Sequence, residues 1–307
     1  MKASTISWIF GVLLALTACT KNSKEGNDKM PRQLLFALYG GDNPSQFKAA
    51  IEPLRRHLEK KLGMEVKFFF TTDYAAVIQA FRSKKVHMAE FTPFAYIIAS
   101  QKPGLLPLAT MGRRGAPALY KSFIFANPKT GIKTLADLKA NASHLTLGYT
   151  DPASTSGHLV PRAFLTSIGL EPTSSFKETM FAGNHAACIL SVKSGKIDIG
   201  CSSSDLAYDK LVREGMMKRT DIVVLWESPG IINNTITIRD DLDTALIRKV
   251  KTVYLNLAKD NYEAFSSYAK LYYPDPSEMS YLPAYDSMFN TLRKIAGNIK
   301  DLQLLEK

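Results

Sequence analysis

The feature that most constrains this chain is an internal repeat, in which residues 74–90 recur in the same hydrophobic phase as residues 185–201. Sliding the chain by 111 positions superposes five identical pairs: Ala75/Ala186, Ala76/Ala187, Ile78/Ile189, Ser83/Ser194 and Lys85/Lys196. Both copies show a helical pattern, a short turn and a short strand pattern. The repeat therefore predicts one such unit in each of two lobes. Chance similarity between two unrelated units remains the alternative.

Strand and helix patterns alternate along most of the chain. Such alternation predicts α/β architecture with largely parallel sheets. Predicted strands cover residues 33–39, 65–70, 86–91, 120–126, 145–149, 197–201, 221–226 and 235–239. Predicted helices cover residues 47–62, 74–83, 93–100, 134–139, 158–168, 185–194 and 205–214, and the chain after residue 239 is predicted to be mostly helical.

Composition excludes several classes of protein. The chain has 307 residues, of which 46% are hydrophobic and 22% charged, so it can bury a substantial core and fits two domains. No apolar run of 18 residues follows the N-terminal segment, which excludes a multi-spanning membrane protein. Lys and Arg number 39 against 28 Asp and Glu, giving a net charge of +11. This excess fits an anionic partner or a generally basic surface. The basic residues are dispersed, so no nucleic-acid partner is predicted.

Residues 1–18 have the form of a secretory signal, with Lys2 followed by an apolar run too short to span a bilayer. The run ends in Leu16-Thr17-Ala18-Cys19, which resembles the lipobox of bacterial lipoproteins. That resemblance implies cleavage before Cys19 and a lipid on its sulfur, and an ordinary cleaved signal is the alternative. The polar residues 19–32 suit a flexible tether. The predicted location is the cell envelope, lipid-anchored, in the periplasm or at the outer face of the cytoplasmic membrane.

Two cysteines follow Cys19, at Cys188 and Cys201. In an exported chain they could form a disulfide, and their spacing carries no metal signature. The sequence leaves the disulfide open.

Residues 148–161 contain the most informative motif, in which a strand runs into three consecutive hydroxyl residues, Ser154, Thr155 and Ser156. Gly157 follows, and a helix is predicted to start near His158. Backbone N–H groups at a helix start carry partial positive charge and bind oxyanions. Hydroxyls can donate further hydrogen bonds, and glycine permits close approach of the backbone to a ligand. A simple serine cap is the alternative, but three hydroxyls and a glycine exceed what capping needs.

The chain at this point resembles the phosphate/phosphite/phosphonate-binding proteins of bacterial ABC transporters, the PhnD-like family, from about residue 34 to residue 257. The matching segments are residues 73–76, 92–96, 119–122, 131–138, 151–157 and 183–185. The resemblance implies a type II periplasmic-binding fold, with two α/β lobes joined by a two-crossover hinge that closes on ligand. Lobe 1 would comprise residues 33–117 and 230–307, and lobe 2 residues 118–229.

The resemblance also implies which side chains hold the ligand. Those expected around a phosphorus oxyanion are Tyr74, Tyr120, Ser154, Thr155, Ser156 and His185. Asp205 would occupy a position where some members carry a carboxylate that meets a ligand ammonium.

Four residues depart from the family pattern: Thr92 where glycine is frequent, Glu90 where an aromatic is frequent, His87 where aspartate is usual, and Asn234 where binders of aminoalkylphosphonates carry an acid. We count Glu90 and Thr92 among the candidate ligand-binding residues. A carboxylate at position 90 would repel a bare dianion but could pair with a cationic group on a zwitterionic ligand. A rim residue in solvent is the alternative for Glu90.

The predicted function is that of a monomeric solute-binding lipoprotein, without cofactor or catalytic activity, which captures a small phosphorus oxyanion or organophosphonate for an ABC permease and ATPase. A hydrolase that uses Ser154 or Ser156 is disfavoured because no Gly-x-Ser-x-Gly elbow is present. The remaining alternative is a lipoprotein of the same fold that binds a metal ion or another small zwitterionic ligand. Its metal ligands would be His87, Glu90, His185 and Asp205, which are scattered in sequence.

Overall fold

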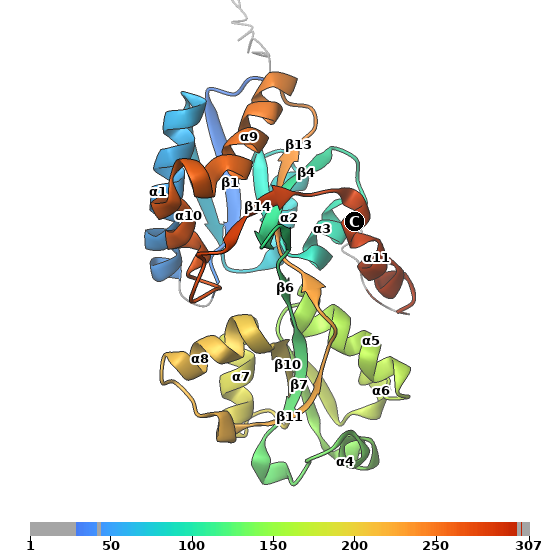
Figure 1. The fold of residues 1–307 in the computed structure, drawn as a ribbon. Helices are drawn as coiled ribbons and strands as arrows, with labels where there is room; N and C mark the ends of the chain where they lie inside the picture. Colours follow the sequence, from blue (N-terminus) through green and yellow to red (C-terminus); the bar gives the residue numbers. More distant parts are fainter. Residues whose placement is uncertain (1–28, 42–43, 300–301, 303–307) are drawn as a thin grey trace, which may run out of the picture.

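A computed structural model describes residues 29–41, 44–299 and 302 of the chain. The predicted signal sequence, Cys19 and most of the predicted tether lie outside these residues. Two lobes lie one above the other (Figure 1), each built around its own β-sheet. We call the lobe with the seven-stranded sheet lobe 1 and the lobe with the five-stranded sheet lobe 2. Among the described residues no helix is both long and apolar enough to cross a membrane.

Lobe 1 has the strand order β14-β4-β13-β3-β1-β2, with β5 paired to β4. Its strands are β1 (Gln33–Tyr39), β2 (Glu65–Thr71), β3 (Met88–Phe91), β4 (Leu105–Arg113), β5 (Ala116–Pro117), β13 (Thr235–Arg239) and β14 (Met279–Pro283). Its helices are α1 (Pro44–Leu62), α2 (Tyr74–Arg82), α3 (Pro93–Ala99), α9 (Thr244–Asp260), α10 (Tyr262–Ala269) and α11 (Asn290–Gly297), with a 3-10 turn at Asp286–Phe289. One apolar core contains side chains of α1, α9 and α10, and a second contains side chains of α2, α3 and α11.

Lobe 2 has the strand order β11-β7-β10-β8-β9. Its strands are β7 (Ser122–Ala126), β8 (Thr146–Tyr149), β9 (Glu178–Phe181), β10 (Ile199–Ser203) and β11 (Val223–Glu227). Its α-helices are α4 (Leu135–Asn141), α5 (Val160–Ser167), α6 (Pro172–Ser175), α7 (His185–Ser194) and α8 (Asp209–Arg213). Two π-helical turns, Thr155–Leu159 and Ser204–Tyr208, lead directly into α5 and α8, and 3-10 turns cover Pro128–Thr130, Ala142–His144 and Arg219–Asp221.

Two short strands connect the lobes. The chain leaves lobe 1 through β6 (Leu119–Tyr120) and returns through β12 (Ile231–Ile232), and these two strands pair with each other in antiparallel fashion. In Figure 1 β6 lies between the two sheets. The lobes also share apolar contacts, because the core that contains α3 and α11 includes Ala153 and Leu159 from lobe 2. Helix α11 packs against both α3 and α5.

The predicted repeat is confirmed by the strand registers. Strand β1 pairs in parallel with β2 and β3, and β8 pairs in the same way with β9 and β10. The pairs Leu35↔Lys67 and Phe36↔Met88 of lobe 1 recur 111 positions later as Thr146↔Glu178 and Leu147↔Ile199 of lobe 2. The helix caps recur as well, since Asp73 caps α2 by accepting from Ala76 N–H and Asn184 caps α7 by accepting from Ala187 N–H. Each lobe therefore contains one copy of the same unit.

The expectation of largely parallel sheets is wrong. Strands β13, β4 and β14 run antiparallel to their neighbours in lobe 1, as do β7 and β11 in lobe 2. Strand β13 enters the sheet of lobe 1 from the returning crossover, so no helix precedes it to reverse its direction. Five strands of the described residues were missed. Strand β4 contains Pro107 and Gly112, β9 is a partly exposed edge strand, β14 interrupts the C-terminal region predicted to be mostly helical, and β5 and β12 are two residues long each.

Several predicted boundaries are also corrected. The single strand predicted over residues 120–126 is divided at Lys121 into β6 and β7. The helices predicted from residues 158 and 205 begin earlier, as the π turns at Thr155 and Ser204. Cys188 and Cys201 are buried and form no disulfide, and the Cys188 thiol lies 3.5 Å from the carbonyl oxygen of Cys201.

The repeat generates a stability prediction at Asp198, whose carboxylate accepts from the backbone N–H of Thr146 at 2.9 Å and from its hydroxyl at 2.8 Å. At the equivalent place in lobe 1, His87 Nδ1 accepts from Leu35 N–H at 2.9 Å. Asp198→Ala leaves the Thr146 N–H without its acceptor and should lower the free energy of unfolding by roughly 1–3 kcal/mol, measured by urea denaturation. Asp198→Asn keeps an acceptor oxygen, so its free energy of unfolding should fall less than that of Asp198→Ala. Equal stability of wild type and Asp198→Ala would contradict the assigned role.

Candidate functional site

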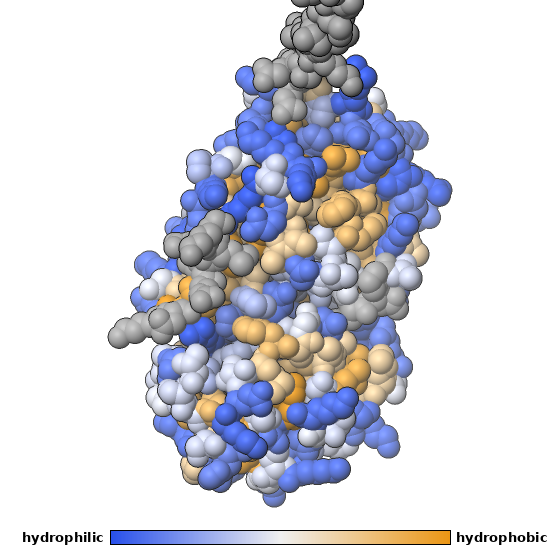
Figure 2. Space-filling view, turned by 180° about the vertical axis from the view of Figure 1, so that it is seen from behind, coloured by the Kyte–Doolittle hydropathy of each residue, from blue (hydrophilic) through white to orange (hydrophobic). Residues whose placement is uncertain are grey.

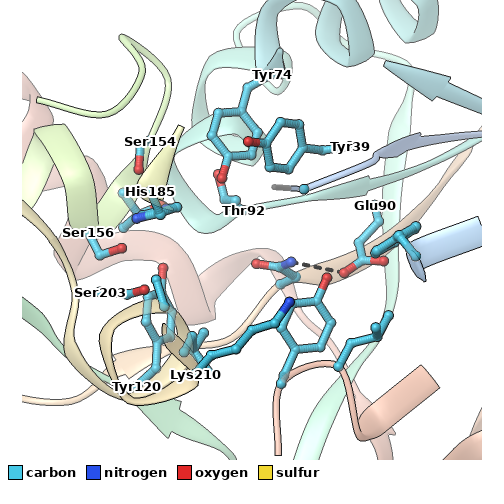
Figure 3. Close-up of a pocket in the computed structure, with 18 of the residues that line it drawn as sticks. Tyr39, Tyr74, Glu90, Thr92, Tyr120, Ser154, Ser156, His185, Ser203 and Lys210 are labelled. Carbon is cyan, nitrogen blue, oxygen red and sulfur yellow. Dashed lines mark hydrogen bonds between the residues drawn. The ribbon is translucent and has the colours of Figure 1, made fainter. Parts of the chain in front are cut away.

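A cavity lies between the two lobes, where strands of both sheets end (Figure 3). The space inside it that the centre of a water molecule can reach is about 110 Å³. Since roughly 10–15 Å³ of such space holds one water, the cavity has room for a ligand larger than a bare oxyanion. It is lined by eight of the nine candidate ligand-binding residues, namely Tyr74, Glu90, Thr92, Tyr120, Ser154, Thr155, Ser156 and His185. Asp205 is not among the lining residues.

The hydroxyls of Ser154 and Thr155 are oriented by backbone donors. Ser154 Oγ accepts from Gly157 N–H at 3.0 Å, and Thr155 Oγ1 accepts from Phe94 N–H at 2.8 Å. A hydroxyl that already accepts a hydrogen bond keeps its own proton for donation. Both residues are almost fully buried, yet both line the cavity. They are therefore set up as donors to an acceptor-rich ligand. Ser154 also caps the π turn that begins at Thr155, so the capping interpretation of this serine is confirmed and its role in ligand binding stays a prediction.

Gly157 has a different role from the one expected. A Cβ atom at this position would lie 1.9 Å from Thr150 Oγ1, far inside van der Waals contact. The missing side chain therefore makes room for Thr150 at the end of β8, rather than for a ligand. We call the segment Ser154–Ser156 the hydroxyl turn. It is fixed further by Ser122, whose hydroxyl donates to the carbonyl oxygen of Ser156 at 2.6 Å.

Repeat-equivalent residues face the cavity from the two lobes. Tyr74 and His185 are the first residues of α2 and α7, and Thr92 and Ser203 follow the same 111-residue relation at the ends of β3 and β10. All four line the cavity (Figure 3). His185 Nδ1 is 2.8 Å from Ser202 Oγ, which orients the imidazole. The carboxyl ends of parallel strands thus supply polar groups from both sides, as open α/β sheets do.

Tyr120 is a buried phenol on the crossover strand β6. Burial raises its pKa well above the ordinary range of tyrosine, and the hydroxyls of Thr155 and Ser156 oppose that rise only in part. The phenol is therefore neutral at physiological pH, which keeps a donor in the cavity without adding negative charge.

Glu90 is not a rim residue in solvent. Its Oε1 accepts from Asn234 Nδ2 at 2.9 Å, and its Oε2 accepts from the Tyr268 hydroxyl. Burial raises the pKa of this carboxyl, while the two hydrogen bonds lower it in part. In Figure 3 Glu90 lies on the opposite side of the cavity from Ser154 and Ser156. The cavity therefore has hydroxyl donors at one side and a carboxyl group at the other.

The structure does not assemble the four residues of the alternative metal site. Asp205 Oδ1 accepts from Lys121 N–H at 2.9 Å and so fixes the turn after β6. His87 accepts a hydrogen bond from the backbone N–H of Leu35 in β1 and does not line the cavity. Across the described part of the chain, no three His, Cys, Asp or Glu side chains come close enough to hold a metal ion.

Other lining residues escaped the sequence analysis. They are Tyr39, Gly40, Gly41, Gln46, Phe47, Leu206, Ala207, Lys210, Leu271 and Tyr272. Tyr39 and the two glycines end the first predicted strand, so the rule that ligands lie beyond strand ends could have found them. Lys210 lies two residues after the π turn of Ser204–Tyr208 and carries no motif. Leu271 and Tyr272 follow α10 and had no sequence signal.

The sequence of the chain is similar to those of known transport proteins. Residues 36–274 match the family model described as ABC transporter, phosphonate, periplasmic substrate-binding protein. The chain is 30% identical over 233 residues to the phosphonates-binding periplasmic protein of Escherichia coli K12, covering 76% of this chain and 68% of that protein. It is 27% identical over 303 residues to the phosphate-import protein PhnD of Mycolicibacterium smegmatis, covering 92% of each.

A solved structure agrees with these sequence relatives. The binding-protein component of an ABC phosphonate transporter from Pseudomonas aeruginosa superposes with a TM-score of 0.75 at 26% identity, over 87% of this chain and 86% of that one. The predicted type II periplasmic-binding fold is confirmed by this likeness and by the two lobes described above.

His158, next to the hydroxyl turn, generates a pH prediction. Its Nδ1 is 2.7 Å from the Pro152 carbonyl oxygen, and its ring packs against Tyr149 and Phe181. Burial lowers the pKa of His158 to about 4, with Arg162 adding to the effect and the bond to Pro152 opposing it. Between pH 6.5 and 4 the unfolded chain therefore binds a proton at this residue that the folded chain does not.

The contribution of neutral His158 to the free energy of unfolding should be fully present above about pH 6.5 and should be lost progressively as the pH falls toward 4. The loss over that window should be about 3 kcal/mol. His158→Gln keeps a donor for Pro152 but cannot titrate, so its free energy of unfolding should fall less across the window. Urea unfolding of both proteins at pH 7, 5.5 and 4.5 measures the difference. Identical pH dependence in the two proteins would rule out the buried neutral histidine.

Proposed function

Because this chain belongs to the family of periplasmic substrate-binding proteins of ABC phosphonate transporters, we propose that it captures a phosphonate, phosphite or phosphate oxyanion in the interlobe cavity. The permease and ATPase of an ABC importer would receive that ligand. The observation that carries the proposal is the pair of hydroxyls at Ser154 and Thr155. Each hydroxyl oxygen accepts a hydrogen bond from a backbone N–H, so its own proton is available for donation to a ligand.

The chemistry of the lining suits a tetrahedral oxyanion. Ser154, Thr155, Ser156 and Tyr120 offer neutral O–H donors, and His185 offers a ring that binds an anion most strongly when protonated. Hydrogen bonds to a charged oxygen are stronger than neutral ones, and a buried site strengthens them further. An oxyanion can thus be held mainly by uncharged donors. The net charge of the cavity is small, since among the described residues that line it Glu90 is the one Asp or Glu and Lys210 is the one Lys or Arg.

The lobes support a hinge mechanism. Residues 33–117 and 230–307 would form one rigid body and residues 118–229 the other, with β6 and β12 as the hinge strands. A ligand that contacts Tyr74 of lobe 1 and the hydroxyl turn of lobe 2 favours the closed arrangement. The shift toward closure can be no larger than the difference in ligand affinity between the two arrangements.

The export and anchoring of the protein complete the proposal. The lipobox-like segment that ends in Cys19 supports lipid attachment at that sulfur, with the tether before residue 33 spanning from the membrane to lobe 1. We expect a monomer in the cell envelope that docks to its permease from the periplasmic side or from the outer face of the cytoplasmic membrane.

A second candidate function is capture of a phosphorus ligand that also carries a cationic group. The observation that favours it is Glu90, a desolvated carboxyl that lines the cavity and has no ion-pair partner among the described residues. An ammonium group would supply the missing countercharge. The two candidates differ in ligand but share the hydroxyl turn.

Removal of one hydroxyl tests the proposal. Ser156→Ala should raise the Kd for methylphosphonate or phosphate roughly 10- to 100-fold, because a hydrogen bond to a charged group contributes about 1.5–3 kcal/mol. Isothermal titration calorimetry measures the change. Ser154→Ala should lower both the affinity and the stability, since it also removes the hydroxyl that caps the turn by accepting from Gly157 N–H. The matched control is Ser194→Ala at the exposed end of α7. Unchanged affinity in both site variants would refute the binding of the ligand by the hydroxyl turn.

Replacement of Glu90 separates the two candidate functions. Glu90→Gln should tighten binding of methylphosphonate, because it removes a negative charge from the cavity, and should weaken binding of an aminoalkylphosphonate. Rising pH ionises Glu90 through its raised pKa, so wild type should lose methylphosphonate affinity relative to Glu90→Gln as pH rises. Calorimetry with both ligands at two pH values gives the ratios. No change with either ligand would exclude Glu90 from the ligand site.

A further inference from the structure

A second cavity lies beside the ligand cavity and is lined by residues at α8 of lobe 2 and at α1, α10 and the chain after α10 of lobe 1. In Figure 1 α8 lies on the side of lobe 2 that is next to α1 and α10. We call it the vestibule. Its lining residues are Gln46, Ala50, Lys210, Arg213, Glu214, Ser267, Lys270, Leu271 and Pro274. Three of them, Gln46, Lys210 and Leu271, also line the ligand cavity. These three residues therefore form the partition between the vestibule and the ligand cavity.

The vestibule is basic. It contains Lys210, Arg213 and Lys270 against a single acid, Glu214. The two sides of the vestibule belong to different lobes, with Lys210 and Arg213 on α8 and Lys270 just after α10. Cationic side chains that line a concave passage raise the local concentration of anions and their association rate. The position of this charge, beside the ligand cavity, makes it relevant to ligand capture.

Lys210 is distinguished from the other two cations by its place at the partition. Among the described residues that line the ligand cavity it is the single Lys or Arg side chain. Its ammonium lies 4.0 Å from Glu214 Oε1, at the limit of an ion pair four residues apart on one helix. Such partly exposed pairs are weak, so little holds the ammonium at Glu214. In Figure 3 the Lys210 side chain starts beside Tyr120 in this view and extends toward the side of the cavity on which Glu90 lies.

We propose that Lys210 is the gate of the ligand cavity and binds the solvent-facing side of the captured anion, while Arg213 and Lys270 form an entrance that steers anions toward it. The inference rests on the proposed capture of an oxyanion. It assigns two separate kinetic roles to three cations. Lys210 contacts the bound ligand and slows its release. Arg213 and Lys270 act at a distance and speed its arrival.

The physical reason for a cation at this place is the charge balance of the cavity. The hydroxyl turn supplies donors but no net charge, and Glu90 on the other side of the cavity disfavours an anion. Lys210 supplies the opposing charge from lobe 2. A flexible lysine at the partition can let the anion pass and then follow it, whereas a fixed cation deep inside would meet the ligand only after entry.

The test is the kinetics of methylphosphonate binding to the purified protein, followed by stopped-flow at low and high ionic strength. Lys210→Gln should raise the dissociation rate about tenfold at both ionic strengths, since it removes a charged contact to the bound ligand. Arg213→Gln and Lys270→Gln should lower the association rate about two- to threefold at low ionic strength and match wild type at high ionic strength. Their dissociation rates should not change.

Controls and outcomes separate this inference from the function on which it rests. Lys139→Gln on α4, at the end of lobe 2 remote from the vestibule in Figure 1, should behave as wild type in both rates. Lys210→Met keeps the aliphatic stem, so a loss shared by Lys210→Gln and Lys210→Met belongs to the charge. Absence of binding by wild type to methylphosphonate, phosphite and phosphate would refute the proposed function itself. Binding by wild type with an unchanged dissociation rate in both Lys210 variants would refute the gate, and a salt-independent association rate would refute the entrance.

Discussion

The hydrogen bond from the Phe94 backbone N–H of lobe 1 to the Thr155 hydroxyl of lobe 2 is the interaction on which the ligand site depends. It crosses the interface at the hydroxyl turn and occupies the acceptor side of Thr155, so the proton of that hydroxyl points to other acceptors. The apolar core around α3, Ala153 and Leu159 excludes water from the same region. Interlobe packing and ligand chemistry thus use the same few residues. A change in the distance between the lobes would alter the donors that the ligand meets.

The repeat explains why two lobes produce one site. Each copy places the start of a helix and the end of a strand at the interlobe face, which brings Tyr74 and Thr92 opposite His185 and Ser203. The copies have diverged at equivalent positions. Glu90 corresponds to the fully buried Cys201, and the carboxylate of Asp198 corresponds to the imidazole of His87. Of these four residues Glu90 lines the cavity, so it gives the lobe 1 side a carboxyl group that lobe 2 lacks at the equivalent position. Lys210 and the vestibule add charge on the side from which a ligand enters.

Local patterns and the family resemblance together predicted the fold and much of the site. The motif of three hydroxyls pointed to Ser154, Thr155 and Ser156, and the resemblance implied Tyr74, Tyr120 and His185, all of which line the cavity. The missed residues share a physical cause. Lys210, Leu271 and Tyr272 reach the cavity only because the lobes face each other, and no local spacing records that arrangement. Strands β4 and β9 were missed because breakers and exposure erased their apolar alternation. Asp205 shows the limit of positional analogy, since its carboxylate holds a turn instead of lining the cavity.

The central claim is that backbone-oriented hydroxyls on the Ser154–Ser156 turn hold a phosphorus oxyanion between the lobes. A crystal structure of the protein with methylphosphonate tests it most directly. We expect phosphonate oxygens within hydrogen-bonding distance of the hydroxyls of Ser154 and Thr155, with the methyl group directed toward the side of Glu90. Methylphosphonate bound elsewhere, or bound in the cavity without contact to either hydroxyl, would contradict the account.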